Sequence, residues 1–288
     1  MGAPLPLPAR DQGIASLLAG IRRSCNRLGR LERDPLALVR PYADVADREI
    51  AGFVAATLAF GRVDLILSAV RAALGPLGPR PATALDGLSE GDIGLIWSGF
   101  QYRFCFSKDI VALLVGLKRA RAEYGGLEAL FGDCDSAVPP VSGAGDPTVA
   151  GALSLFSRRI NDLAIHRETV RRSAAGLRRG LVPEPSRGSA CKRLFLFLRW
   201  MVRKDEVDPG GWTSVSTSRL VVPLDVHMAR VCHERLGFIP TPAATLANAL
   251  RATACFRIYA PRDPVKFDFA LTRPGIDPAE GDEVWGCG

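Results

Sequence analysis

The segment Asp47–Phe60 constrains the fold more than any other part of this sequence. It reads DREIAGFVAATLAF, and beyond Glu49 its residues are apolar on almost every side of a helix. A helix of this kind has to be buried by other helices at the centre of a bundle. A second such segment, Ala190–Arg203, lies far along the chain. The two need a shared core, and we therefore expect a helical bundle built around both.

The rest of the chain shows helical periodicity. Lys108–Tyr124 has apolar residues at helical spacing, and no alternating strand pattern of useful length or internal repeat is present. We expect further helices over residues 13–29, 63–74, 88–98, 148–164, 168–180, 225–236, 243–254 and 264–271. The sequence thus predicts an all-α protein of two lobes. Residues 48–203 are expected to form one bundle, and 1–47 to pack with 204–288 as the other.

The basic residues are concentrated in one part of the chain. Lys and Arg exceed Asp and Glu by seven over the 288 residues. Between Arg158 and Lys204, thirteen basic residues stand against three acidic ones, a net +10, which leaves about −3 for the remainder. A concentrated positive charge favours a polyanionic partner such as nucleic acid.

Several classes of protein are not expected. The seven cysteines are scattered without a CxxC pair, which favours reduced thiols over a disulfide framework. The first residues lack the pattern of a signal peptide, and the apolar runs are too short to span a bilayer. His227 and His233 do not share a helical face, so we expect no metal site and no cofactor. We expect a monomeric cytoplasmic protein, associated with the nucleoid if bacterial, that does not bind membranes.

The stretch Pro185–Asp225 carries the candidate chemistry. A Gly-Ser turn opens the long apolar helix, and Lys192 lies in its first turn. After a connection rich in Pro and Gly, Asp225 stands just before a second helix. Instead of a catalytic role, Asp225 can have the purely structural role of an N-cap. Lys192 can likewise be an ordinary surface lysine. A lysine and an aspartate at two helix N-termini can, however, share one cleft.

The start of the apolar helix is also a candidate phosphate site. Gly188 lets a backbone approach closely, and the amides at a helix N-terminus attract anions. Arg187, Lys192 and Arg193 add positive charge there. Lys192, Arg199 and Arg203 lie within about 20° of one helix face. The structural alternative for that face is an ordinary solvated basic stripe.

Two motifs in this stretch resemble a known superfamily. The first motif resembles the aspartate motif of the helix-hairpin-helix, Gly/Pro-rich, Asp (HhH-GPD) DNA glycosylases. It consists of the apolar run Leu220–Leu224, the sequence DVHMARV that begins at Asp225, and Arg235-Leu236-Gly237. GSACKR at 188–193 resembles their hairpin and the start of the next helix, where bifunctional members carry a lysine nucleophile. Residues 49–64 and 99–124 resemble the superfamily's central helix and its Gly-Phe turn and following helix. The resemblance covers roughly residues 45–240 and implies a two-lobed helical fold.

A narrower resemblance spans nearly the whole chain. Three segments resemble an uncharacterised bacterial family placed in this superfamily: PSRGSACKRLFLFLRWMVRKD, VVPLDVHMARV and DPVKFDFAL. That family is similar to archaeal 8-oxoguanine DNA glycosylases, which also have a long connection between lysine and aspartate. Here Lys192 and Asp225 are 33 positions apart. The chain departs from the superfamily at the hairpin 182–189, in lacking the four-cysteine iron–sulfur motif, and in having Gly61 where some members place a gap-filling glutamine.

The resemblance implies roles for named residues. Lys192 would attack the sugar C1′ of a flipped nucleotide, and Asp225 would assist deprotonation and stabilise the cationic sugar. The residues expected to contact DNA are Arg187, Gly188, Ser189, Arg193, Arg199 and Arg62. Those expected in the base pocket or as a wedge are Phe60, Gln101, Tyr102 and Trp97. The alternative for the aromatic residues is an ordinary place in the core.

Three functions compete at this point. The first is a DNA-binding protein resembling base-excision DNA glycosylases, either a monofunctional glycosylase or a bifunctional glycosylase and AP lyase that acts on an oxidised purine in double-stranded DNA. The second is a non-catalytic DNA- or RNA-binding module of the same fold. The third, structural protein interaction, explains the apolar core but not the concentration of basic residues. Substituting Lys192→Gln separates the first two, because binding survives in both and strand cleavage is lost only in an enzyme.

Overall fold

The computed structural model describes residues 6–139, 148–164 and 182–276, which are mostly helical. The α-helices are α1 Gln12–Cys25, α2 Val45–Leu58, α3 Val63–Leu74, α4 Pro81–Gly87, α5 Glu90–Ile96, α6 Ser107–Tyr124, α7 Leu127–Ser136, α8 Ala150–Ala164, α9 Lys192–Val202, α10 Val226–Arg230, α11 Leu246–Tyr259 and α12 Asp268–Ile276. A hairpin of two short strands, β1 Gln101–Tyr102 and β2 Cys105–Phe106, joins α5 to α6. The helix expected over 168–180 falls outside the described residues.

Helix α2 lies at the centre of the core, as its all-round apolar pattern predicts. It begins one turn earlier than expected, because Asp44 caps it by accepting hydrogen bonds from the amides of Ala46 and Asp47. α2 packs directly on α9, the second apolar helix. The rings of Phe53 and Phe197 meet edge to face with their centroids 5.1 Å apart. The shared core of these two helices is confirmed.

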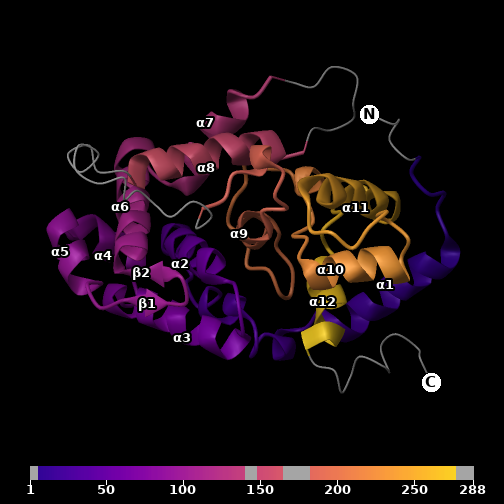
Figure 1. Cartoon of the computed structure of the whole chain (residues 1–288), viewed down its shortest axis with the longest axis horizontal. Helices are drawn as coiled ribbons and strands as arrows, with labels where there is room; N and C mark the ends of the chain where they lie inside the picture. Colours follow the sequence, from indigo (N-terminus) through magenta and orange to yellow (C-terminus); the bar gives the residue numbers. More distant parts are fainter. Residues whose placement is uncertain (1–5, 140–147, 165–181, 277–288) are drawn as a thin grey trace.

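Helix α9 lies in the middle of the molecule (Figure 1). Helices α2 to α6 are on one side of it, α1 and α10 to α12 are on the other, and α7 and α8 run along the top of the view. α1 packs against α12, but the 3-10 turn Pro35–Leu38 packs against α2 and α3. Buried residues from both sides of α9 belong to one hydrophobic cluster. The division into 48–203 and 1–47 plus 204–288 stays a prediction.

The hairpin and the end of α10 differ from the predicted all-helical pattern. Strands β1 and β2 have two residues each, too few to produce a visible alternation in the sequence. α10 is shorter than the helix expected over 225–236, because its last turn widens into a π-helix at Val231–Arg235. None of the helices in the described ranges combines the length and apolar character needed to cross a bilayer.

Candidate active site

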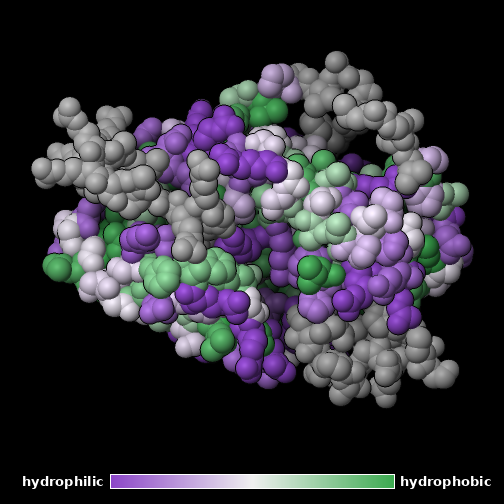
Figure 2. Space-filling model, in the orientation of Figure 1, coloured by the Kyte–Doolittle hydropathy of each residue, from purple (hydrophilic) through white to green (hydrophobic). Residues whose placement is uncertain are grey.

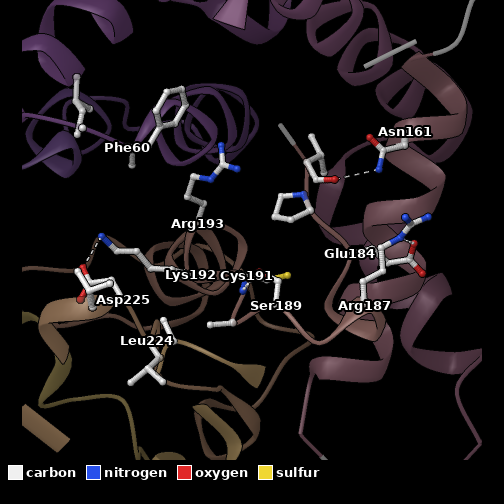
Figure 3. Close-up of a pocket in the computed structure, with 18 of the residues that line it drawn as sticks. Phe60, Asn161, Glu184, Arg187, Ser189, Cys191, Lys192, Arg193, Leu224 and Asp225 are labelled. Atoms are coloured by element: carbon white, nitrogen blue, oxygen red, sulfur yellow. Dashed lines mark hydrogen bonds and ion pairs between the residues drawn. The ribbon is translucent and has the colours of Figure 1, made fainter. Parts of the chain in front are cut away.

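A cleft of about 970 Å³ opens beside the start of α9. Its walls come from five separate parts of the chain: the end of α2 through the start of α3, helix α8, the segment 182–193, the start of α10, and Ala244 just before α11. Figure 3 shows Lys192, Asp225 and Phe60 towards one end of this cleft, and Glu184, Arg187 and Asn161 towards the other. Hydrophilic surface lies in the hollow between the two groups of helices, with weakly hydrophobic surface beside the β hairpin (Figure 2).

Lys192 is the first residue of α9, and the turn before it sets its position. A 3-10 turn at Pro185–Arg187 ends at Gly188, whose φ of 84° favours glycine. The carbonyl of Gly188 accepts a hydrogen bond from the Leu246 amide at 3.0 Å, and Ser189 forms a β-bridge with Thr245. The predicted turn is therefore held by the start of α11.

Asp225 acts as an N-cap and as the partner of Lys192. Its Oδ1 accepts a hydrogen bond from the Met228 amide at 2.8 Å at the start of α10. Its Oδ2 lies 3.0 Å from Lys192 Nζ. The side chains of Lys192 and Asp225 are 35% and 22% exposed, so the pair can be reached from the cleft. The prediction that the two residues share one cleft is confirmed; their catalytic roles stay a prediction.

The surroundings of Asp225 favour its charged form. Burial raises the pKa of the Asp225 carboxyl, but the Lys192 ammonium and the Met228 amide together outweigh burial. The pKa therefore lies below its ordinary value, and His227 contributes in the same direction. At neutral pH the cleft holds a carboxylate beside an ammonium group.

The rest of the predicted basic stripe on α9 is buried. Arg199 is 3% exposed and donates hydrogen bonds to Asp208 and Asp268. Arg203, also 3% exposed, pairs with Asp208, Asp263 and Asp205. The prediction that Arg199 contacts DNA is therefore wrong, because the side chain is enclosed by carboxylates of the protein itself. Lys192 is the member of this stripe that reaches the cleft.

Phe60 lines the cleft, and two neighbouring residues fix its ring. Arg193, which is half-buried, donates a hydrogen bond from Nη1 to the Thr57 carbonyl at 2.6 Å, and its guanidinium lies 5.2 Å from the centre of the Phe60 ring. The Phe104 ring stacks on Phe60 at 4.5 Å with an interplanar angle of 10°. Arg193, predicted to contact DNA, is thus engaged within the cleft wall, where it positions Phe60.

The other predicted pocket residues lie elsewhere. Trp97 is 2% exposed and donates its indole N–H to the Ala73 carbonyl at 3.0 Å, so it is a core residue and its predicted place in the pocket is wrong. Tyr102 is 7% exposed and donates its hydroxyl to the Phe60 carbonyl, so it supports the cleft wall from behind. Gln101 is exposed, as is Arg62, which was predicted to contact DNA, but neither is among the described residues that line the cleft.

Some cleft residues were missed by the sequence analysis. Glu184, Asn161, Val226 and His227 all line the cleft. Val226 and His227 follow Asp225 directly, so the helix start that presents Asp225 also brings them to the rim. Glu184 and Asn161 have no motif that would identify them. Among the described residues, no group of three or more His, Cys, Asp or Glu side chains is arranged to hold a metal ion.

Comparison with known proteins identifies a family. A family model described as "Protein of unknown function (DUF2400)" matches residues 34–277. The chain belongs to this family. The match includes Lys192, Asp225 and every other described residue that lines the cleft of this DUF2400 protein. No curated protein matches the chain, and no solved structure does. The role of the cleft therefore has to be argued from its own residues.

Proposed function

We propose that this DUF2400 protein binds duplex DNA and removes a damaged base, with Lys192 as the nucleophile. The observation that supports this proposal is the pairing of Lys192 Nζ with Asp225 Oδ2 at 3.0 Å inside a cleft of about 970 Å³. Proteins bind small molecules in pockets of about 300–1,000 Å³, so the cleft has room for one extruded nucleotide. The proposal includes the two-lobed HhH-GPD architecture that the sequence motifs imply.

The first step has to release Lys192 from its resting state. An ammonium group paired with a carboxylate is not a nucleophile, so Lys192 must lose a proton before it attacks. We assign that proton to the departing base. The bond between C1′ and the base nitrogen breaks, its electron pair remains with the base, and the base nitrogen takes the proton. Lys192 is then a neutral amine beside an electron-poor C1′.

Asp225 has two functions in the steps that follow. Its carboxylate is ionised at neutral pH, because its pKa lies below the ordinary value, and it stabilises positive charge on the sugar. After the amine nitrogen bonds to C1′, the carboxylate accepts the proton that the new secondary ammonium releases. The C1′–O4′ bond then breaks: O4′ keeps its electron pair and takes the proton back from Asp225, while the nitrogen lone pair forms the C=N bond of a protonated Schiff base between Lys192 and C1′. This imine is the species that borohydride reduces to a stable adduct.

The walls of the cleft suit a nucleotide. Phe60 offers an aromatic surface held in place by Arg193 and Phe104. Val226 is 62% exposed at the rim beside Asp225. Aromatic and apolar side chains contact a flipped base by stacking, and its extrusion costs a few kcal/mol that such contacts offset. The cleft thus has aromatic and apolar side chains in its wall and the Lys192–Asp225 pair in one space.

The test is borohydride trapping with a panel of duplex oligonucleotides, each carrying one damaged base. We expect the wild-type protein to form a covalent adduct with at least one of them. Lys192→Gln should abolish the adduct while duplex affinity stays within a few-fold. Lys204→Gln is the matched control, since Lys204 is an exposed lysine at the far end of α9. Absence of an adduct with every oligonucleotide contradicts the proposal.

The alternative is a non-catalytic DNA- or RNA-binding module. It is favoured by the charged resting state of Lys192, since an ammonium group binds a phosphate well without any reaction. Under this alternative Lys192→Gln weakens binding and lowers its salt dependence by the share of one phosphate contact. No adduct forms with any oligonucleotide.

A further inference from the structure

The end of the cleft opposite Lys192 holds a second charged cluster, centred on Glu184. Its Oε1 lies 2.6 Å from Arg158 Nη2 and accepts a hydrogen bond from the Ser186 hydroxyl at 2.5 Å. Its Oε2 lies 3.4 Å from Arg187 Nε. Two guanidinium groups and a hydroxyl therefore surround one carboxylate. Figure 3 shows Glu184 and Arg187 at the side of the cleft away from Asp225.

The backbone beneath this cluster is fixed to α8. The Ser157 hydroxyl donates to the Pro183 carbonyl at 2.7 Å, and the Asn161 side chain donates to the Val182 carbonyl at 3.1 Å. The Ser186 amide donates to the Ser154 hydroxyl at 3.1 Å. These contacts hold the backbone on both sides of Glu184.

Exposure differs sharply within the cluster. The side chains of Arg158 and Arg187 are 55% and 67% exposed, whereas that of Glu184 is 13% exposed. The carboxylate thus lies beneath two guanidinium groups that face the solvent. The hydrogen bonds from Arg158 and Ser186 lower the pKa of Glu184 to about 2, so it is charged under all ordinary conditions. With two arginines and one glutamate, the cluster retains one net positive charge.

We propose that Arg158, Arg187 and Ser186 form an anion subsite for a phosphate of the bound nucleic acid, and that Glu184 occupies this subsite in the free protein. Guanidinium and hydroxyl groups that surround a carboxylate offer the donors that a phosphate oxygen needs. Arg158 and Arg187 are exposed enough to turn from Glu184 towards a phosphate without moving the backbone. Glu184 then acts as an internal competitor that lowers affinity for anions.

The identity of the ligand rests on the proposed function, but the subsite does not. If Lys192 and Asp225 act on a nucleotide extruded from a strand, the phosphates of that strand lie along the cleft. The Glu184 cluster is at the end of the same cleft, where it would hold the strand beside the reacting nucleotide. A free phosphate compound offers the same oxygen atoms, so the subsite can be tested with and without nucleic acid.

The experiment compares Glu184→Gln with a matched control. Asp86→Asn also removes one negative charge, from a carboxylate that pairs with Arg121 at 2.7 Å, and neither residue lines the cleft. We expect Glu184→Gln to tighten duplex binding by roughly three- to tenfold, the effect of about one charge-assisted contact. The plot of log affinity against log salt concentration should become steeper by the contribution of about one phosphate contact. Asp86→Asn should change both quantities much less.

A triple variant tests whether the gain in affinity comes from the two arginines. Adding Arg158→Gln and Arg187→Gln to Glu184→Gln should remove the gain in affinity, and circular dichroism checks that this triple variant is folded. If Glu184→Gln and Asp86→Asn bind the duplex equally, or if the gain survives the loss of both arginines, the subsite is wrong.

Calorimetry with inorganic tripolyphosphate separates this inference from the proposed function. Glu184→Gln should bind tripolyphosphate more tightly than the wild type, even if neither protein forms a borohydride adduct with DNA. Equal tripolyphosphate affinity in the two proteins overturns the subsite whatever the DNA experiments show. A missing adduct with a positive tripolyphosphate result overturns the proposed reaction alone.

Discussion

Lys192 and Arg199 lie two turns apart on the same face of α9, and each is paired with an aspartate from the C-terminal part of the chain. Lys192 pairs with Asp225 in the cleft, and Arg199 pairs with Asp268 in the interior. Two oppositely charged pairs thus lie in a row along α9, one in the cleft and one in the interior.

The first prediction concerns the buried part of this row of charges. Arg199→Met leaves Asp268 and Asp208 in the interior with less compensation, and such losses cost about 3–5 kcal/mol. Urea unfolding should show this loss. Arg230→Met is the control, since Arg230 and Glu234 are 66% and 54% exposed at a separation of 3.9 Å, and it should cost less than about 0.5 kcal/mol. Equal costs for the two variants would show that the interior pairs do not stabilise the fold.

The sequence predicts much of the helical framework for simple physical reasons. Val63–Leu74 is a helix with the bounds that were predicted, because its apolar spacing and the breakers after it are local signals. The burial of α2 and α9 follows from apolar residues on all their sides. Lys192 and Asp225 were expected to share a cleft because each stands at the start of a helix, where short sequence signals place it. Each of these features depends on information carried by a short stretch of sequence.

The features that were missed depend on distant partners. Arg199 has the same sequence appearance as a solvated arginine, and only Asp268, 69 positions away, makes its burial possible. Trp97 lies next to an aromatic turn, yet the carbonyl that accepts its indole proton belongs to Ala73 in another helix. Glu184 is one of three acidic residues in the basic segment 158–204, and its ion pair depends on Arg158 from α8. Local patterns do not reveal such pairings.

A second prediction concerns stability in acid. Burial raises the pKa of Asp205, but Arg203 and the amides of Val207 and Asp208 outweigh burial and lower it to about 2. A carboxyl with a lowered pKa stabilises the folded protein at every pH above its ordinary pKa of 3.8. This stabilisation is lost as the pH falls towards 2. Asp205→Asn should therefore reduce the free energy of unfolding by about 2 kcal/mol at pH 7. Urea unfolding at several pH values should show the difference from wild type shrinking between pH 4 and pH 2; a difference independent of pH would contradict this cause.

A third prediction concerns Gly61 at the edge of the cleft. Its φ is +99°, and a Cβ there would lie 3.1 Å from the Tyr102 hydroxyl and from a nitrogen of Arg103. Gly61→Ala should therefore cost about 1–3 kcal/mol from backbone strain alone. Gly61→Gln, which places here the residue that some glycosylases carry, should cost at least as much.

The control for this prediction is Gly20→Ala in α1, where a Cβ meets nothing within 4 Å. That substitution should be neutral or stabilise by up to about 1 kcal/mol, because Ala favours the helix. Thermal unfolding measures both variants. A Gly61→Ala protein as stable as Gly20→Ala would show that the turn between α2 and α3 adapts to a side chain.

The last prediction separates the two contacts that Asp225 makes. Asn is as good an N-cap as Asp, so Asp225→Asn should keep the Met228 hydrogen bond and lose only the ion pair with Lys192, which costs up to about 1 kcal/mol at this partly exposed position. Asp225→Ala also removes the cap and should cost about 1 kcal/mol more. Borohydride trapping should fail in both variants, because both lack the carboxylate that stabilises the sugar cation and accepts the amine proton. If Asp225→Asn forms the adduct at the wild-type rate and Asp225→Ala does not, Asp225 supports the reaction only by capping α10, and its charge has no part in the chemistry.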